Sequence, residues 1–174
     1  LDEFRRNLVE IARILKSSRV VLVTVPFNYR LAPAWNHRQP LVSDPDREGS
    51  IRRAIVLATT FLDDSLPTRA LESLQAAEQP DCESPILHYL KGECLVELNR
   101  PGEAENAFAL CREQMVGHLG GRLSINREIR RAAEDAGCEL LDARALFDRV
   151  QNERGGHFNR DLIHDDCHPT PLGH

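Results

Sequence analysis

The chain has 174 residues, of which 41% are apolar and 28% charged, and its net charge is −5. This composition is typical of a globular domain with a substantial core, and it contains no basic patch of the kind that binds nucleic acid. The longest apolar run, Val20 to Val25, is much shorter than the roughly 18 residues that span a bilayer, so no membrane segment is expected within these residues.

The first 48 residues predict a helix, a strand and a loop. Apolar residues recur at helical spacing and predict an amphipathic helix over 2–16, with an apolar face made of Leu1, Phe4, Leu8, Ile11 and Leu15. The run RVVLVTVP (19–26) is continuous and β-branched, which is typical of a strand buried on both faces of a parallel sheet. Residues 27–48 are rich in proline and polar residues and predict a loop.

The middle of the chain, 49–118, contains an internal repeat. Residues 51–84 align with residues 85–118 at an offset of 34, so that small residues match small ones and large match large. The matched pairs are Ala58 with Gly92, Phe61 with Leu95, Ala70 with Ala104, Leu74 with Phe108, and Ala77 with Cys111.

Each half of the repeat predicts two helices, at 50–62 with 67–78 and at 84–98 with 101–115. The pattern resembles the tetratricopeptide repeat at the small residue of the first helix and at the alanine of the second. It departs from that family at the aromatic position of the first helix, which holds Ala54 and His88. Two unrelated helical hairpins are the alternative interpretation.

The last part of the chain, 119–174, returns to the pattern of the first. Residues 123–137 predict a helix ended by Gly137, and residues 138–143 predict a short strand. The sequence therefore predicts an α/β domain, formed by 1–48 and 119–174, with a helical insertion at 49–118.

The stretch DDCHPTPLGH (165–174) concentrates groups that can transfer protons. Asp165 and His168 are three residues apart, so in a turn they lie on the same side. A carboxylate there can accept a hydrogen bond from the imidazole Nδ1 and leave Nε2 as a base, which is what a serine nucleophile requires. Asp161 and His164 have the same spacing, so the spacing alone is a weak signal.

This closing stretch resembles the last conserved block of the SGNH, or GDSL-type, ester hydrolases. The resemblance implies a partial flavodoxin-like α/β/α sandwich, with Asp165 as the acid and His168 as the base of a Ser-His-Asp catalytic triad. The flanking segments at 4–28 and 124–147 look like the helices and strands that precede this block. A subgroup of the family carries tetratricopeptide-like helices inserted between them.

The chain departs from that family at its nucleophile. The family's serine lies in a Gly-Asp-Ser motif, and an asparagine in a Gly-x-Asn-Asp motif helps to form its oxyanion hole; neither motif occurs in these residues. Because the chain begins without methionine inside a helical pattern, it is interpreted as a piece of a longer protein. The piece alone is expected to be inactive on esters.

A metal site is the first alternative for the closing stretch. The candidate ligands are His157, His164, Asp165, Asp166, His168 and His174. The spacing of His164 and His168 suits a helix face, but Pro169 opposes a helix there, so neither a metal nor a cofactor is predicted. Cys167 as a nucleophile is disfavoured, because adjacent residues rarely face each other.

Other polar residues have less specific interpretations. Asn28 and Arg30 follow the first predicted strand and are predicted to bind substrate, with ordering of the loop as the alternative. His37 and His88 are expected to be surface or packing residues. The five cysteines are scattered, which favours buried free thiols over disulfides or a zinc site.

Two functions from different classes follow. The first is a serine ester hydrolase that cleaves O-acyl esters, with an acylated carbohydrate as one candidate substrate. The second is a non-catalytic module whose helical repeats bind a protein partner. The sequence leaves the compartment open, including export or anchoring through a segment outside these residues.

Overall fold

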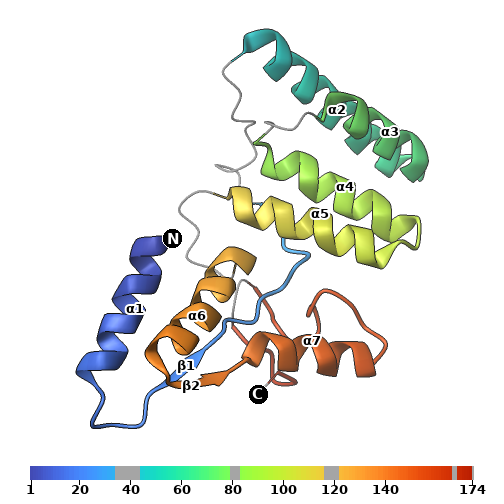
Figure 1. The fold of residues 1–174 in the computed structure, drawn as a ribbon. Coiled ribbons are helices and arrows are strands. Elements are labelled where there is room, and N and C mark those ends of the chain that lie inside the picture. Colours follow the sequence, from blue (N-terminus) through green and yellow to red (C-terminus); the bar gives the residue numbers. More distant parts are fainter. Residues whose placement is uncertain (34–43, 79–82, 116–121, 166–167, 174) are drawn as a thin grey trace. The chain divides into compact units, whose positions relative to one another are not determined.

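The computed structural model describes residues 1–33, 44–78, 83–115, 122–165 and 168–173 (Figure 1). The chain forms two compact units, one made of Leu1–Asn28 with Leu119–His174 and the other of Tyr29–His118. The first unit is therefore built from the two ends of the chain and the second from its middle. The second unit begins earlier in the sequence than the helical insertion predicted to start at residue 49.

The first unit contains α1 (Asp2–Ile14), β1 (Val21–Val23), α6 (Leu123–Ala136), β2 (Glu139–Leu141) and α7 (Ala143–Glu153). β1 and β2 pair in parallel, with Leu22 opposite Leu140, and α6 packs against both strands and against α1 (Figure 1). α6 ends at Gly137, whose φ of 63° is the left-handed conformation that favours glycine.

The apolar face predicted for the first helix is only partly correct. The buried residues of α1 are Val9 and Ala12. Leu1, Ile11 and Leu15 belong to the predicted face, yet they are 60%, 51% and 46% exposed. The helix itself is confirmed, but its buried side is rotated by about one residue, because α1 packs mainly against α6 and not across a broad sheet.

The predicted α/β fold class, a flavodoxin-like sandwich, is wrong. Such a sandwich needs an open parallel sheet with helices on both faces. In the described ranges there are seven helices and only two strands of three residues each, and this part of the chain is 63% helical. The strands are also not buried on both faces, since Val21, Val23 and Leu141 are 39–46% exposed.

The physical reason lies at the ends of the two strands. After β1, the main-chain N–H and C=O of Val25 bond to the side chain of Asn126 on α6, at 2.8 and 2.9 Å, where a neighbouring strand would otherwise bond. After β2, Asp142 caps α7 by accepting a hydrogen bond from the N–H of Ala145. The β-branched run at 19–26 therefore forms only a short strand.

The second unit contains two helical hairpins, formed by α2 (Pro45–Asp63) with α3 (Pro67–Ala77) and by α4 (Pro85–Glu97) with α5 (Pro101–Gln114). Each of these helices begins with proline, at a position where the missing N–H costs no helical hydrogen bond. The helices occupy the regions where the sequence predicted them, although α2 begins earlier, at Pro45.

The two hairpins repeat in detail at the offset of 34 residues. Ser65 and Asn99 occupy equivalent positions in the turns, and both adopt left-handed φ angles, of 58° and 55°. Between α4 and α5, Gly92 lies directly under the Phe108 ring, so that a Cβ at this glycine would be 2.3 Å from a ring carbon. The small residue predicted at position 92 therefore makes room for a buried aromatic side chain.

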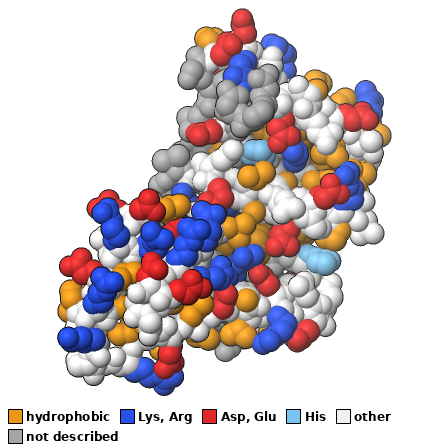
Figure 2. Space-filling model, viewed as in Figure 1, with side chains coloured by type: hydrophobic (Ala, Val, Ile, Leu, Met, Phe, Trp, Pro, Cys, Tyr) orange, Lys and Arg blue, Asp and Glu red, His pale blue; other side chains and the backbone are white. Residues whose placement is uncertain are grey.

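Charged side chains of both signs are interspersed over the visible face of the molecule (Figure 2). No helix among the described residues is long and apolar enough to cross a membrane.

Candidate functional site: the Asp165–His168 pair

Residues 162–164 and 168–170 form a small antiparallel ladder in the first unit. Ile163 and Pro169 form an isolated bridge, and the N–H of His164 donates to the carbonyl of His168 at 2.9 Å. The N–H of Thr170 donates to the carbonyl of Leu162, also at 2.9 Å. Asp165 and His168 are thus held at the end of a hydrogen-bonded ladder.

Asp165 and His168, here called the acid–base pair, contact each other directly. The Nδ1 atom of His168 lies 2.9 Å from each carboxylate oxygen of Asp165, and the main-chain N–H of His168 donates to Oδ1 at 3.1 Å. A carboxylate at Nδ1 favours the tautomer with its proton on that nitrogen, which leaves the Nε2 lone pair as the base. The His168 side chain is 78% exposed, so a reactant can reach it.

The second pair with the same spacing is not formed. The Asp161 carboxylate accepts a hydrogen bond from Gln151 Nε2 at 3.2 Å, and its main-chain carbonyl accepts one from Thr170 Oγ1 at 2.7 Å. Within the described ranges, the imidazole of His164 makes no hydrogen bond to Asp161. The structure therefore distinguishes two Asp-x-x-His sequences that the spacing alone did not.

Thr170 and Gly173 hold the residues that follow the ladder. The Thr170 hydroxyl accepts hydrogen bonds from the N–H groups of Leu172 and Gly173, at 3.2 and 3.3 Å, while it donates to the carbonyl of Asp161. A Cβ at Gly173 would lie 2.2 Å from the main-chain oxygen of Leu162. The threonine and glycine of the closing motif thus have a local structural role.

The two predicted substrate-binding residues have other partners. Asn28 is 5% exposed, and its Nδ2 donates to the carbonyl of Ile163 at 3.4 Å. Arg30 belongs to the second unit, where its guanidinium donates two hydrogen bonds to Glu93 of α4, at 2.8 and 2.7 Å. This hydrogen bonding raises the pKa of Arg30 above its ordinary value. Asn28 thus contacts the ladder that carries the acid–base pair, whereas Arg30 forms an ion pair with Glu93.

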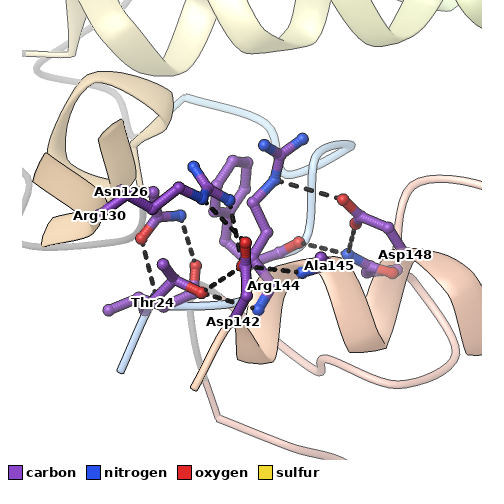
Figure 3. A network of polar contacts seen from close by, with 10 residues as sticks. Thr24, Asn126, Arg130, Asp142, Arg144, Ala145 and Asp148 are labelled. Atoms are coloured by element: carbon purple, nitrogen blue, oxygen red, sulfur yellow. Dashed lines mark hydrogen bonds and ion pairs between the residues drawn. The ribbon is translucent and has the colours of Figure 1, made fainter. Parts of the chain in front are cut away.

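A polar network lies where β1 and β2 end (Figure 3). Asp142 follows β2 and accepts hydrogen bonds from Arg130 of α6, at 2.8 and 3.0 Å, and from Thr24 Oγ1 at 2.7 Å. The Arg130 guanidinium, with the Thr24 hydroxyl, lowers the pKa of Asp142 to about 2. Asp142 is therefore ionised near neutral pH and joins the ends of the strands to α6 and α7.

Further polar contacts connect this region to the segment before the acid–base pair. Asn159 is 1% exposed, and its Nδ2 donates to Asp148 Oδ1 at 2.7 Å and to the carbonyl of Phe27 at 3.4 Å. Asp148 also pairs with Arg144, at 3.3 Å (Figure 3). Asn159 therefore links α7 to the residues that follow β1.

Several of these polar residues were not predicted from the sequence. Asn126 lies three residues before Ile129, so the helical period places both on the same buried face of α6. Asp142 directly precedes a helical pattern, which is the position of an N-cap. No comparable sequence signal points to Asn159. Its partner Phe27 is 132 residues away, and its partner Asp148 is 11 residues away with no regular spacing that links the two.

The other candidate groups give no second site. Among the described residues, no three His, Cys, Asp or Glu side chains gather in a way that could hold a metal ion. Asp166, Cys167, His174 and His37 lie outside the described residues. His88 is 4% exposed in α4, with Nδ1 3.6 Å from the Glu78 carboxylate, so it is a packing residue.

Two of the cysteines are buried in the second unit. Cys94 and Cys111 are free thiols, and burial raises their pKa values to about 11 and about 12. They are therefore protonated near neutral pH and unreactive.

No protein-family model matches the chain, and neither a curated protein nor a solved structure matches it. The resemblance to the SGNH, or GDSL-type, hydrolases with tetratricopeptide-like repeats is therefore corrected. Among the residues that the structure describes, the two-stranded sheet and the predominance of helix do not correspond to an α/β/α sandwich. Neither that fold nor its catalytic triad can therefore be transferred to this chain as a family property.

Proposed function

We propose that Asp165 and His168 act as the orienting acid and the general base in the hydrolysis of an O-acyl ester. The observation that carries the proposal is the contact of His168 Nδ1 with both Asp165 oxygens, at 2.9 Å, on a side chain that is 78% exposed. This arrangement combines a fixed tautomer with an accessible Nε2, which are the two properties that a general base needs.

The chemistry follows from that geometry. Nε2 of His168 accepts the proton of a serine hydroxyl as its oxygen attacks the ester carbonyl, and Asp165 stabilises the imidazolium that forms. The imidazolium then gives the proton to the leaving alcohol. A water molecule later repeats the sequence on the acyl-enzyme and regenerates the serine.

The nucleophile in this proposal is a serine outside these 174 residues. Within the described part of the chain, no hydroxyl or thiol is hydrogen-bonded to Nε2 of His168. We therefore propose that the acid–base pair forms one part of an active site and that a serine from further polypeptide completes it. The proposal does not specify the acyl group.

The test is labelling of the full-length natural protein with a fluorophosphonate, which reacts with an activated serine. We expect one labelled serine, and loss of labelling by about 10²–10⁴-fold in His168→Ala, which is the range of general-base contributions. His164→Ala is the matched control and is expected to label normally, because His164 forms no pair with Asp161. Absent labelling in the folded wild-type protein, or equal loss in both variants, would contradict the proposal.

A second candidate function is partner binding by the helical hairpins. It is supported by a hollow of about 210 Å³ in the second unit, which Leu71, Leu95 and Leu110 line together with polar residues. Leu110 is 48% exposed there, although leucine is usually buried. If labelling is absent while the protein is folded, this binding function becomes the better explanation.

A further inference from the structure

Two buried asparagines, Asn28 and Asn159, each bond to the main chain of the segment that contains the other. Asn28, at the exit of β1, donates to the carbonyl of Ile163, while Asn159 donates to the carbonyl of Phe27, with both N···O distances at 3.4 Å. The side chain of each asparagine thus reaches the main chain of the opposite segment. The residues that follow β1 are thereby joined to the residues that precede the pair.

Ile163 is the residue through which this connection reaches the pair. It is fully buried, its N–H donates to the carbonyl of Asn159 at 2.8 Å, and it forms the bridge with Pro169. Pro169 directly follows His168, and His164 directly follows Ile163. A displacement of the Ile163 main chain would therefore move both sides of the ladder that carries the pair.

We propose that Asn28 is a positioning residue for the acid–base pair, a role that rests on the function proposed above. Asn28 donates a hydrogen bond to the carbonyl of Ile163 and so connects the segment after β1 to the ladder. We infer that this connection keeps the His168 ring in contact with Asp165. Asn28 is 5% exposed, and its amide donates to the main-chain carbonyl of Ile163.

Asn126 provides a matched control for a purely structural role. It is also a buried asparagine that bonds to the main chain just after β1, and it makes two bonds, at 2.8 and 2.9 Å, to Val25. These bonds connect β1 to α6 and not to the ladder. Loss of the Asn126 amide should therefore reduce overall stability more than loss of the Asn28 amide, without changing the His168 ring.

The experiment measures which ring nitrogen of His168 carries the proton, by long-range ¹H–¹⁵N spectra of the ¹⁵N-labelled chain at about pH 8.5. The variants are Asn28→Ser and Asn126→Ser, with His168→Gln to assign the signal. We expect Nδ1–H to dominate in the wild type. In Asn28→Ser the ratio of Nδ1–H to Nε2–H should fall, by at most about fivefold, which is the largest effect that one lost hydrogen bond can transmit to the ring. In Asn126→Ser it should stay at the wild-type value.

Asn28→Gln keeps an amide donor and replaces Asn28→Ser in the experiment if the serine variant does not fold. It should shift the tautomer ratio in the same direction by a smaller factor. A wild-type ratio in the Asn28 variants, or an equal shift in Asn126→Ser, would overturn the role of Asn28 while the proposed function stands. A wild-type His168 in the Nε2–H form would instead overturn the proposed function, and the role of Asn28 with it.

Discussion

Thr24 and Asp142 lie 118 residues apart in the sequence, and their side chains are joined by a 2.7 Å hydrogen bond. Thr24 follows β1 and Asp142 follows β2, so this bond ties together the two points at which the chain leaves the small parallel sheet. In the part of the chain that the structure describes, the sheet consists of two strands of three residues. Polar side chains after the strands therefore contribute much of what holds these ends in place.

The first prediction concerns the stability provided by Asp142. Its pKa of about 2 is lower than the ordinary value near 3.9, so its contribution is present above about pH 4 and is lost as the pH falls through about 2. We expect Asp142→Asn to lower the free energy of unfolding at pH 7 by about 1–2 kcal/mol. Urea unfolding from pH 7 down to pH 2 measures both effects.

Glu139→Gln is the control for Asp142→Asn. Glu139 pairs with Arg19 on the surface, where the two side chains are 56% and 78% exposed, so its loss should change stability far less than the loss of Asp142. Equal losses in the two variants would show that the network at the strand ends has no special role.

The second prediction concerns the contact between Gly92 and Phe108. A Cβ at residue 92 would lie 2.3 Å from the Phe108 ring, so Gly92→Ala forces the ring or α5 to move and should destabilise the chain by about 1–3 kcal/mol. Gly102→Ala is the matched control, because nothing lies within 4 Å of that Cβ and alanine favours helix. Thermal unfolding distinguishes them: a lower melting temperature is expected only for Gly92→Ala.

The third prediction concerns the Thr170 hydroxyl, which donates to the carbonyl of Asp161 at 2.7 Å. Thr170→Val keeps the shape of the side chain and removes its hydrogen bonds. We expect the N–H of His164, which bonds within the ladder, to exchange with solvent about five- to tenfold faster. The N–H of Thr24, which bonds to Leu141, is an internal control and should exchange at an unchanged rate.

The sequence predicted local features better than the fold. The 34-residue repeat predicted two helical hairpins, and the structure contains both, with matching left-handed turns at Ser65 and Asn99. The predicted fold class was wrong because a β-branched run predicts a strand but not how many other strands pair with it in the sheet. At Val25, the Asn126 side chain takes the place of a neighbouring strand.

The candidate site could be predicted only in part for the same reason. The contact between Asp165 and His168 follows from a spacing of three residues, and the structure brings these side chains together. The difference between this pair and Asp161 with His164 depends on Gln151, ten residues away, which no pattern identifies. Asn28 and Asn159 bond to Ile163 and Phe27, which are more than 100 residues away in the sequence. Such long-range contacts cannot be predicted from the pattern of a single sequence.

Asp165 is proposed to hold His168 as a base. The most direct test is to measure which ring nitrogen of His168 carries the proton in the unsubstituted chain. We predict that His168 carries its proton on Nδ1, and that Asp165→Asn moves the proton largely to Nε2. His164, which has the same spacing from Asp161 but no such contact, should show Nε2–H as its major form throughout. A tautomer ratio for His168 that equals that of His164, or that Asp165→Asn leaves unchanged, would contradict the account.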